Sequence, residues 1–494
     1  MPSRNAQTPN RNTRWLRRVA AVTLIAIRST AAFAQAGGHD SPNDRIGICT
    51  HFAHGWDIDA LLPQIQELHV GWVRDGIYWD QMELSKGVYR IPPKTQSWID
   101  KLHSAGIHVL LSFSKPNPSY TPFDAEAYAK AAAFIAVAEK DKVQAIEVLN
   151  EPNNASAQFR KVFGGSWDGI EKDGTPSPWL QKYVTLLNAT AAAVHAANPE
   201  MKVIGLGATT EANLRAIQLG LSSDVTGLTD HPYSSQTLPE FLTFTPAFPH
   251  DVAAGEPLAA FGASPQMKTL IGAYRRALER MTRTGTELWF TEWGFSTFRE
   301  DGRPNPGHFL GISESQQAAY IQRRVIETLA LGVDYQFLYD LQDDGPLPDE
   351  VEDNFGLLTA DRMRKPAFAA VQRVAAVTSG WSPLPDLQVD VAKQHVDAPL
   401  RMYAFSAPNG EVKLAVWMVS ASNAEGTVSL RLRASIAHPE ANDFLTGKHV
   451  VLQSSASGDG TILADVPISD RVLVISWPAN RYLPATASKR VNNR

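Results

Sequence analysis

The feature of this sequence that most restricts its fold is a regular alternation of short apolar segments with amphipathic ones. Strands are expected at residues 46–51, 72–75, 107–113, 145–150, 202–207, 225–231, 286–292 and 333–340. Each strand is followed by an expected helix, at residues 58–69, 95–105, 124–140, 179–197, 211–220, 265–282, 313–331 and 366–379. Eight successive strand–helix units predict the α/β class and, within it, a (β/α)8 TIM barrel over residues 41–380.

Three of the expected helices end at a glycine, after which a strand begins at once: Gly71, Gly106 and Gly332. A glycine at this place can take the left-handed conformation that closes a helix, so we expect a positive φ at all three. An open doubly wound sheet is the alternative fold. That fold usually carries a glycine-rich phosphate loop after its first strand, and residues 51–56 do not form one.

The connections between these elements predict where a site would lie. Loops from helix to strand are short, whereas long loops follow four of the strands, at residues 152–178, 232–264, 294–312 and 341–365. In a barrel these long loops lie at the carboxyl ends of the strands, on the face that carries the active site in barrel enzymes. We therefore expect a cleft on that face.

From about residue 382 the pattern changes to short alternating or β-branched segments, separated by turns such as Pro408-Asn409-Gly410. This pattern predicts an all-β, sandwich-like accessory domain at residues 382–480. Residues 485–494 are expected to form a flexible tail.

Residues 1–34 are typical of a secretory signal peptide. Residues 14–18 are basic, a short apolar run follows, and Ala32-Phe33-Ala34 fits a cleavage site. The apolar run is much shorter than the roughly 20 residues of a membrane span. We expect export to the periplasm or the outside of a bacterium, without a membrane span in the mature chain. A disordered basic tail is the alternative.

Charge and cysteine content exclude further classes of protein. The net charge is −5, and residues 1–34 contain six arginines and no acid, so the rest of the chain is more acidic still. An acidic protein is a poor partner for nucleic acid or for an anionic membrane surface. Cys49 is the single cysteine, which rules out an intramolecular disulfide, and its apolar strand predicts a buried thiol.

Two of the expected strands end in a glutamate. Glu151 follows the strand at residues 145–150, and Glu292 closes the strand at residues 286–292. The carboxyl ends of barrel strands meet at one mouth, so these two side chains should face each other. Cleavage of a glycosidic bond needs such a pair. One carboxyl protonates the leaving oxygen, and the other, ionised, attacks the anomeric carbon or activates water.

Around these strand ends the sequence resembles glycoside hydrolase clan A, and most closely glycoside hydrolase family 39 and its bacterial exopolysaccharide-degrading relatives. The resemblance covers about residues 45–380. The segments that carry it are Val73-Arg74-Asp75 with Trp79 and Gly87-Val88-Tyr89, Asn150-Glu151-Pro152-Asn153, His231-Pro232-Tyr233, Thr291-Glu292, residues 338–345 with Asn354-Phe355-Gly356-Leu357, and Lys365-Pro366-Ala367.

The resemblance implies roles for the matching residues. Glu151 would be the general acid/base, and Glu292 would be the nucleophile of a double displacement with retention. Asn150 would hold the sugar 2-hydroxyl. Arg74 and Tyr233 would hydrogen-bond Glu292 and keep it ionised, while Glu151, with fewer partners, would keep its proton to higher pH. A retaining pair has its carboxyl groups about 5–5.5 Å apart.

Other side chains of the expected mouth are candidates for contact with the sugar: His51, Trp79, His231, Trp293 and Tyr339. Tyr339 lies where many clan A members carry a tryptophan. His51 and His54 have no third ligand at metal spacing, so no metal site is expected. Residues 343–344 and 349–353 are expected to form a solvated acidic loop rather than a calcium site. Glu147 would lie deeper in the barrel as a structural carboxylate.

These features together predict an exported retaining β-glycoside hydrolase that cleaves a polysaccharide or oligosaccharide. We expect it to be endo-acting on an exopolysaccharide, monomeric and without a cofactor. One alternative is an exo-acting glycosidase similar to β-xylosidases. Another is a non-catalytic carbohydrate-binding protein of exopolysaccharide export, which would have no need for both carboxylates.

Overall fold

The computed structural model describes residues 41–120, 123–154, 159–234, 237–242, 252–253, 256–257, 266–298, 309–421, 424–458 and 460–479. The expected signal peptide at residues 1–34 and the expected tail at residues 485–494 lie outside this range, as do parts of the loops at 232–264 and 294–312. Within the described residues, no helix has both the length and the apolar character that crossing a membrane requires.

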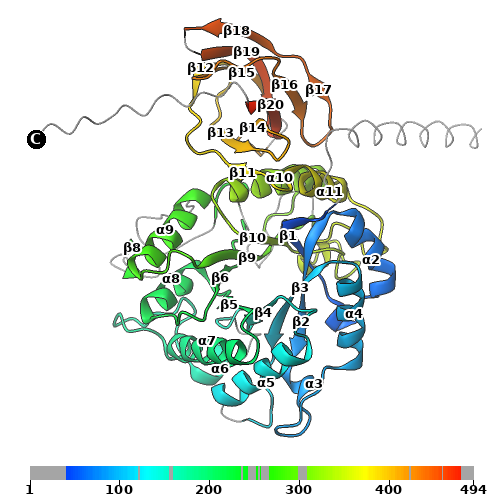
Figure 1. The fold of residues 1–494 in the computed structure, drawn as a ribbon, viewed down its shortest axis with the longest axis vertical. Coiled ribbons are helices and arrows are strands. Elements are labelled where there is room, and N and C mark those ends of the chain that lie inside the picture. Colours follow the sequence, from blue (N-terminus) through cyan, green and yellow to red (C-terminus); the bar gives the residue numbers. More distant parts are fainter. Residues whose placement is uncertain are drawn as a thin grey trace, which may run out of the picture. The chain divides into compact units, whose positions relative to one another are not determined.

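Parallel strands close into an eight-stranded barrel in the order β1-β10-β9-β6-β5-β4-β3-β2 (Figure 1). These strands are β1 (Asn43–Cys49), β2 (Val70–Tyr78), β3 (His108–Ser114), β4 (Ala145–Val148), β5 (Lys202–Leu206), β6 (Gly227–Asp230), β9 (Glu287–Trp293) and β10 (Tyr335–Leu338). Each strand lies beside the next barrel strand of the chain, and β10 returns to β1. The predicted TIM barrel is confirmed.

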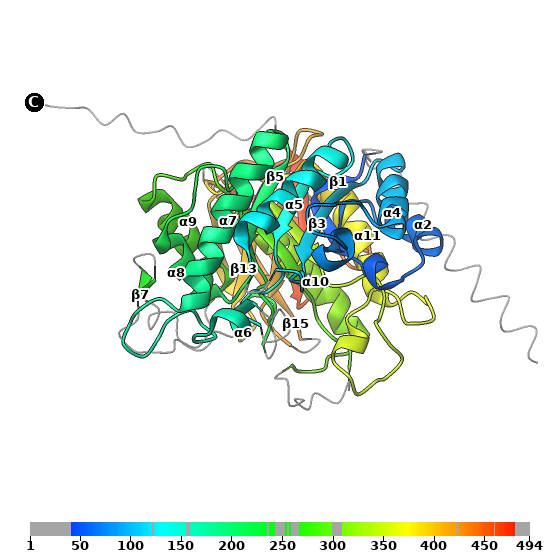
Figure 2. The same cartoon turned by 90° about the horizontal axis from the view of Figure 1, so that it is seen from below.

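Helices surround this barrel (Figures 1 and 2). They are α2 (Ile58–Glu67), α3 (Trp79–Met82), α4 (Pro93–Ser104), α5 (Ala125–Ala138), α6 (Phe159–Phe163), α7 (Pro178–Ala197), α8 (Thr210–Leu219), α9 (Met267–Arg280), α10 (Glu314–Ala330) and α11 (Pro366–Thr378). Side chains fix several helix starts. Asp57, Asp124 and Thr209 accept hydrogen bonds from first-turn N–H groups, and Ser313 forms a capping box with Gln316.

The three expected glycine helix ends differ from one another. Gly106 and Gly332 have φ of 72° and 80°, as predicted. Gly71 does not, because β2 has already begun at Val70, and His69 takes the left-handed position with a φ of 56°. The reason for a glycine at position 71 is close approach: a Cβ there would lie 2.6 Å from the carbonyl oxygen of Asn43 in the neighbouring strand.

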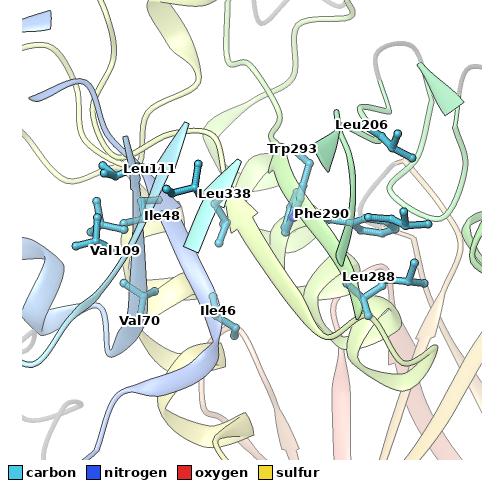
Figure 3. Close-up of a cluster of buried hydrophobic side chains, with 14 of the residues drawn as sticks. Ile46, Ile48, Val70, Val109, Leu111, Leu206, Leu288, Phe290, Trp293 and Leu338 are labelled. Carbon is cyan, nitrogen blue, oxygen red and sulfur yellow. The ribbon is translucent and has the colours of Figure 1, made fainter. Parts of the chain in front are cut away.

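The barrel strands bury side chains on both faces. One set fills the barrel interior and includes Trp72, Leu110, Trp289 and Phe337. Their sequence neighbours point outward and pack under the helices; Figure 3 labels Val109, Leu111, Leu288, Phe290 and Leu338 among them. Burial on both faces explains why these strands read as continuous apolar runs rather than as alternating ones.

The C-terminal region forms two antiparallel sheets around a shared core, as predicted. One sheet contains β11 (Ser382–Pro383), β13 (Leu400–Ser406), β14 (Glu411–Met418), β20 (Leu473–Pro478), β16 (Glu440–Asp443) and β17 (His449–Val450). The other contains β12 (Val389–Gln394), β15 (Glu425–Leu432), β19 (Gly460–Ser469) and β18 (Gln453–Ser457). The β18–β19 hairpin was not expected, because its first strand consists largely of small polar residues.

Candidate active site

The main chain turns sharply after β4, and this turn presents Glu151 to the mouth of the barrel. Leu149 and Glu151 both have positive φ, 64° and 43°, a conformation that residues with a Cβ rarely adopt. Pro152 follows and has no N–H group to continue strand pairing. Backbone strain of this kind concentrates at functional sites, where the surrounding structure has to maintain it.

A bulge in β9 turns Glu292 inward. Leu288 and Phe290 face the helices, so strict alternation would also point Glu292 outward. The pairing of β9 with β10 shifts after Phe290, so that Trp293 rather than Glu292 lies opposite Leu338 on the outer face. The extra residue of the bulge leaves Glu292 directed into the barrel mouth.

Glu151 and Glu292 lie together in this mouth. One carboxylate oxygen of each, with a ring nitrogen of His231, form a group whose atoms are all within 4.8 Å of one another. This separation suits the retaining arrangement of about 5–5.5 Å rather than the inverting one of about 6.5–9.5 Å. The side chains of Glu151 and Glu292 are 27% and 13% exposed. Both are therefore accessible to a ligand yet mostly shielded from bulk water.

Arg74 organises the side of the mouth that contains Glu292. The sequence predicted that Arg74 lies near the end of its strand. In the structure it lies in the middle of β2, and its side chain still reaches the mouth. Nη1 donates to Glu292 at 3.0 Å, Nε to Glu147 at 2.8 Å, and Nη2 to Asn150 Oδ1 at 2.7 Å. Because the oxygen of Asn150 faces Arg74, its amide NH2 remains as the group that can donate to a ligand.

The second oxygen of Glu292 accepts a hydrogen bond from the Tyr233 hydroxyl at 2.8 Å. Each carboxylate oxygen of Glu292 thus has its own donor, and both contacts expected from the sequence are present. Donors of this kind favour the ionised form of a carboxyl group. Glu147 is fully buried and bonded to Arg74 and to Thr291 Oγ1 at 2.7 Å, as expected of a structural carboxylate.

Glu151 is as well paired as Glu292, so the expectation that it has fewer partners is wrong. His231 Nδ1 lies 3.0 Å from one oxygen, and Asn154 Nδ2 donates to the other at 2.8 Å. Burial tends to raise the pKa of Glu151, but the hydrogen bonds from His231 and Asn154 and the positive charges of His231 and Arg74 together outweigh it and hold that pKa below its usual range. Burial tends to lower the pKa of His231, but the carboxylates of Glu292 and Glu151 raise it to about 9. One proton therefore resides on the His231–Glu151 pair, mainly on His231.

The carboxyl pair lies where two cavities adjoin. The larger, of about 710 Å³, is lined by Glu292, Arg74, Asn150, His51 and Tyr339 among others. The smaller, of about 330 Å³, has a different lining that includes Glu151, His231, Tyr233 and Trp167. Since the two glutamates are in contact range, a ligand that extends past them in both directions has space on either side.

Trp79 and Trp293 do not line these cavities, so the prediction that they contact substrate is wrong. Both are fully buried. Trp79 donates its indole N–H to Glu83 at 2.6 Å and stacks on Tyr120. Trp293 lies on the outer side of β9, under the helices (Figure 3). A better candidate for contact with a sugar is Trp167, which lies on the loop after β4 and is 53% exposed.

His51 and Tyr339 do lie in the larger cavity. His51 Nδ1 is 2.6 Å from Asp344 Oδ1, and the Tyr339 hydroxyl is 3.4 Å from Asp344 Oδ2. Asp344 and Glu352 were placed by sequence reasoning in a solvated loop, whereas the structure brings both to the cavity wall. The only sequence signal for this position is that the acidic segment at residues 341–365 follows the carboxyl end of a strand.

Arg324, on α10, holds the segment that carries His231 and Tyr233. Its side chain is fully buried, and it donates to the carbonyl oxygens of Pro232 and Pro239, both at 2.8 Å. Its guanidinium also lies 5.5 Å from the ring of Trp293, the residue after Glu292. A single buried cation thus fixes the backbone beside both glutamates.

The C-terminal sheets contact the same region. Trp417 on β14 donates its indole N–H to Glu240 at 2.7 Å, and Glu240 also receives two bonds from Arg323, at 2.7 and 2.6 Å. All three side chains are buried. The β domain therefore supports the loop after β6 and is not an independent appendage.

Among the described residues, two groups bring three possible metal ligands within 4.8 Å. One is Glu151, His231 and Glu292. The other is His51, Asp340 and Asp344, which was not apparent from sequence spacing.

No protein-family model and no curated protein matches this sequence. Solved structures do match. A family 39 glycoside hydrolase from Bacteroides cellulosilyticus aligns with a TM-score of 0.64 and 19% identity, over 89% of this chain and 82% of that one. The chain has the fold of the clan A glycoside hydrolases.

Two further glycoside-cleaving enzymes align over most of their length. A glucosidase from Croceicoccus marinus has a TM-score of 0.53 and 14% identity, over 90% of this chain and 97% of that one. A family 30 subfamily 8 xylanase from Clostridium acetobutylicum has a TM-score of 0.51 and 12% identity, over 90% and 98%. The resemblance noted around the strand ends thus extends to the fold, including the β domain.

Proposed function

We propose that this protein is a retaining β-glycoside hydrolase that cleaves a polysaccharide or oligosaccharide by double displacement. The observation that carries the proposal is the pairing of Glu151 and Glu292, with oxygens within 4.8 Å and separate sets of donors. Glu292, held by Arg74 and Tyr233, is the nucleophile. Glu151, held by His231 and Asn154, is the general acid/base.

In the first step Glu292 attacks the anomeric carbon, and the bond to the leaving oxygen breaks. The single proton of the pair passes from His231 Nδ1 across 3.0 Å to Glu151, and Glu151 donates it to the leaving oxygen, which leaves Glu151 ionised. This route reconciles an ionised Glu151 in the free protein with its role as an acid, because the pair holds the required proton. Asn150 donates its amide N–H to the sugar 2-hydroxyl, a contact that strengthens as positive charge develops on the ring.

In the second step a water molecule gives its proton to Glu151 and attacks the glycosyl–Glu292 ester. The sugar leaves with its original anomeric configuration, and the His231–Glu151 pair regains its proton. Arg74 and Tyr233 stabilise the carboxylate that Glu292 becomes again on release.

Internal cleavage is the mode that the cavities support. Space on both sides of the carboxyl pair would accept sugars beyond each end of the broken bond, with Trp167 as a stacking surface on the Glu151 side. An exo-acting enzyme usually needs a closed pocket on one side. The exopolysaccharide substrate and export from a bacterial cell remain part of the proposal and rest on the sequence features described above.

Product analysis tests the proposal. Wild-type protein and Glu292→Gln are incubated with a panel of bacterial exopolysaccharides and plant β-glycans. We expect oligosaccharides of several lengths from the wild type, initially β-configured by NMR, and none from the variant. Single sugars alone would indicate terminal attack. Binding by both proteins without any release would support a carbohydrate-binding protein instead.

A further inference from the structure

The group formed by His51, Asp340 and Asp344 lies beside the larger cavity. His51 follows β1, and the two aspartates follow β10, so neighbouring strand ends bring them together. One ring nitrogen and one oxygen of each aspartate lie within 4.8 Å of one another. We propose that these three side chains bind one divalent zinc-like metal ion.

Asp340 is the observation that points to a cation. Its side chain is 1% exposed, and neither of its carboxylate oxygens has a hydrogen-bond partner within the described part of the chain. A carboxylate buried in this way is strongly disfavoured unless a positive charge compensates it. The nearby ammonium group of Lys365 is engaged elsewhere, since it donates to Asp343 at 2.7 Å. A metal ion among the three side chains supplies the missing charge.

The donor types select the kind of ion. One imidazole nitrogen with two carboxylate oxygens suits Zn²⁺ and similar first-row ions, whereas Ca²⁺ and Mg²⁺ prefer oxygen alone. Zinc ligands lie about 2.0–2.2 Å from the ion, which places ligand atoms about 3–4 Å apart. His51 Nδ1 and Asp344 Oδ1 are 2.6 Å apart and share a proton, which the ion would displace. Binding of the ion therefore requires these two atoms to move apart.

The site is reachable from solvent. The side chains of His51 and Asp344 are 18% and 26% exposed, and both line the cavity that also contains Glu292. Asp340 is buried and does not line this cavity. An ion held by three protein ligands keeps at least one position open. Because His51 and Asp344 line the cavity, a sugar hydroxyl in that cavity would be a candidate for this position.

Zinc binding can be measured without substrate, so the outcome is independent of the proposed hydrolase activity. Metal-stripped protein without a histidine tag is titrated with ZnCl2 by isothermal calorimetry, with and without Asp340→Asn and Asp344→Asn. Asp349→Asn, an exposed acid of the same loop outside the group, is the matched control. Circular dichroism checks that each variant is folded.

We expect one saturable site per chain in the wild type and in Asp349→Asn, with affinity at least about tenfold weaker in each of the other two variants. A wild type without saturable binding would overturn the inference, as would equal affinity in Asp344→Asn. If Asp340→Asn does not fold, Asp344→Asn and His51→Ala decide the question, because both alter side chains at the cavity surface. Weak binding that no variant changes would indicate adventitious surface sites and would also overturn it.

Discussion

Tyr233→Phe removes one hydrogen bond to the proposed nucleophile and keeps the aromatic ring in place. The hydroxyl donates to Glu292 at 2.8 Å inside a buried site. A hydrogen bond to a charged group contributes about 1.5–3 kcal/mol, which corresponds to a fall of about 10- to 150-fold in kcat/KM.

The assay is kcat/KM on the aryl β-glycoside that the wild type hydrolyses fastest. Tyr335→Phe is the matched control, because it also removes one hydroxyl, which accepts a hydrogen bond from Lys202 at 3.2 Å. Tyr335 is distant in sequence from Glu292 and lines neither cavity. We expect the control to behave like the wild type. If Tyr233→Phe retained kcat/KM within twofold of the wild-type value, the proposed role of this hydroxyl would be refuted.

Three further predictions follow from the packing and charges. The pKa of His231 is raised to about 9, above its unfolded value of about 6.5. Its charge therefore stabilises the fold below pH 6.5, and this contribution disappears as the pH rises through about 9. Urea unfolding should show this loss of stability with rising pH in the wild type and not in His231→Gln. Arg324→Met leaves buried carbonyl groups unpaired and should lower both Tm and kcat, whereas unchanged values would remove its positioning role. Trp79→Ala should cost about 3–5 kcal/mol of stability. Trp167→Ala, at an exposed position, should leave Tm unchanged and raise KM for a polysaccharide. If Trp79→Ala instead raised KM and Trp167→Ala lowered Tm, the prediction that Trp79 contacts substrate would be restored.

Much of the fold was predictable because it depends on local periodicity. Apolar runs of strand length alternate with helical spacing along the chain, and this pattern needs no knowledge of distant contacts. The element ends were less predictable. β10 is shorter and β2 longer than expected, because pairing with neighbouring strands, rather than composition, decides where a strand stops. The role of Gly71 was mispredicted for a similar reason, since it depends on the close approach of a neighbouring strand.

The candidate site was predictable where it depended on position along a strand. Glu151 and Glu292 follow apolar strands, and the barrel brings all such ends to one mouth. The two tryptophans were misjudged because side-chain direction depends on local geometry. In β9 a bulge sets which of Glu292 and Trp293 faces inward, and no residue in the segment marks that bulge.

By itself, then, the sequence determined the barrel, the β domain and the two glutamates, all of which depend on periodicity and on strand ends. Only the tertiary structure decided which groups hold the protons and charges. His231 meets Glu151 across 80 positions, and His51 meets Asp344 across 293. Such contacts depend on strand order and side-chain direction, and the strength of each charge interaction depends on how far the fold excludes water from it.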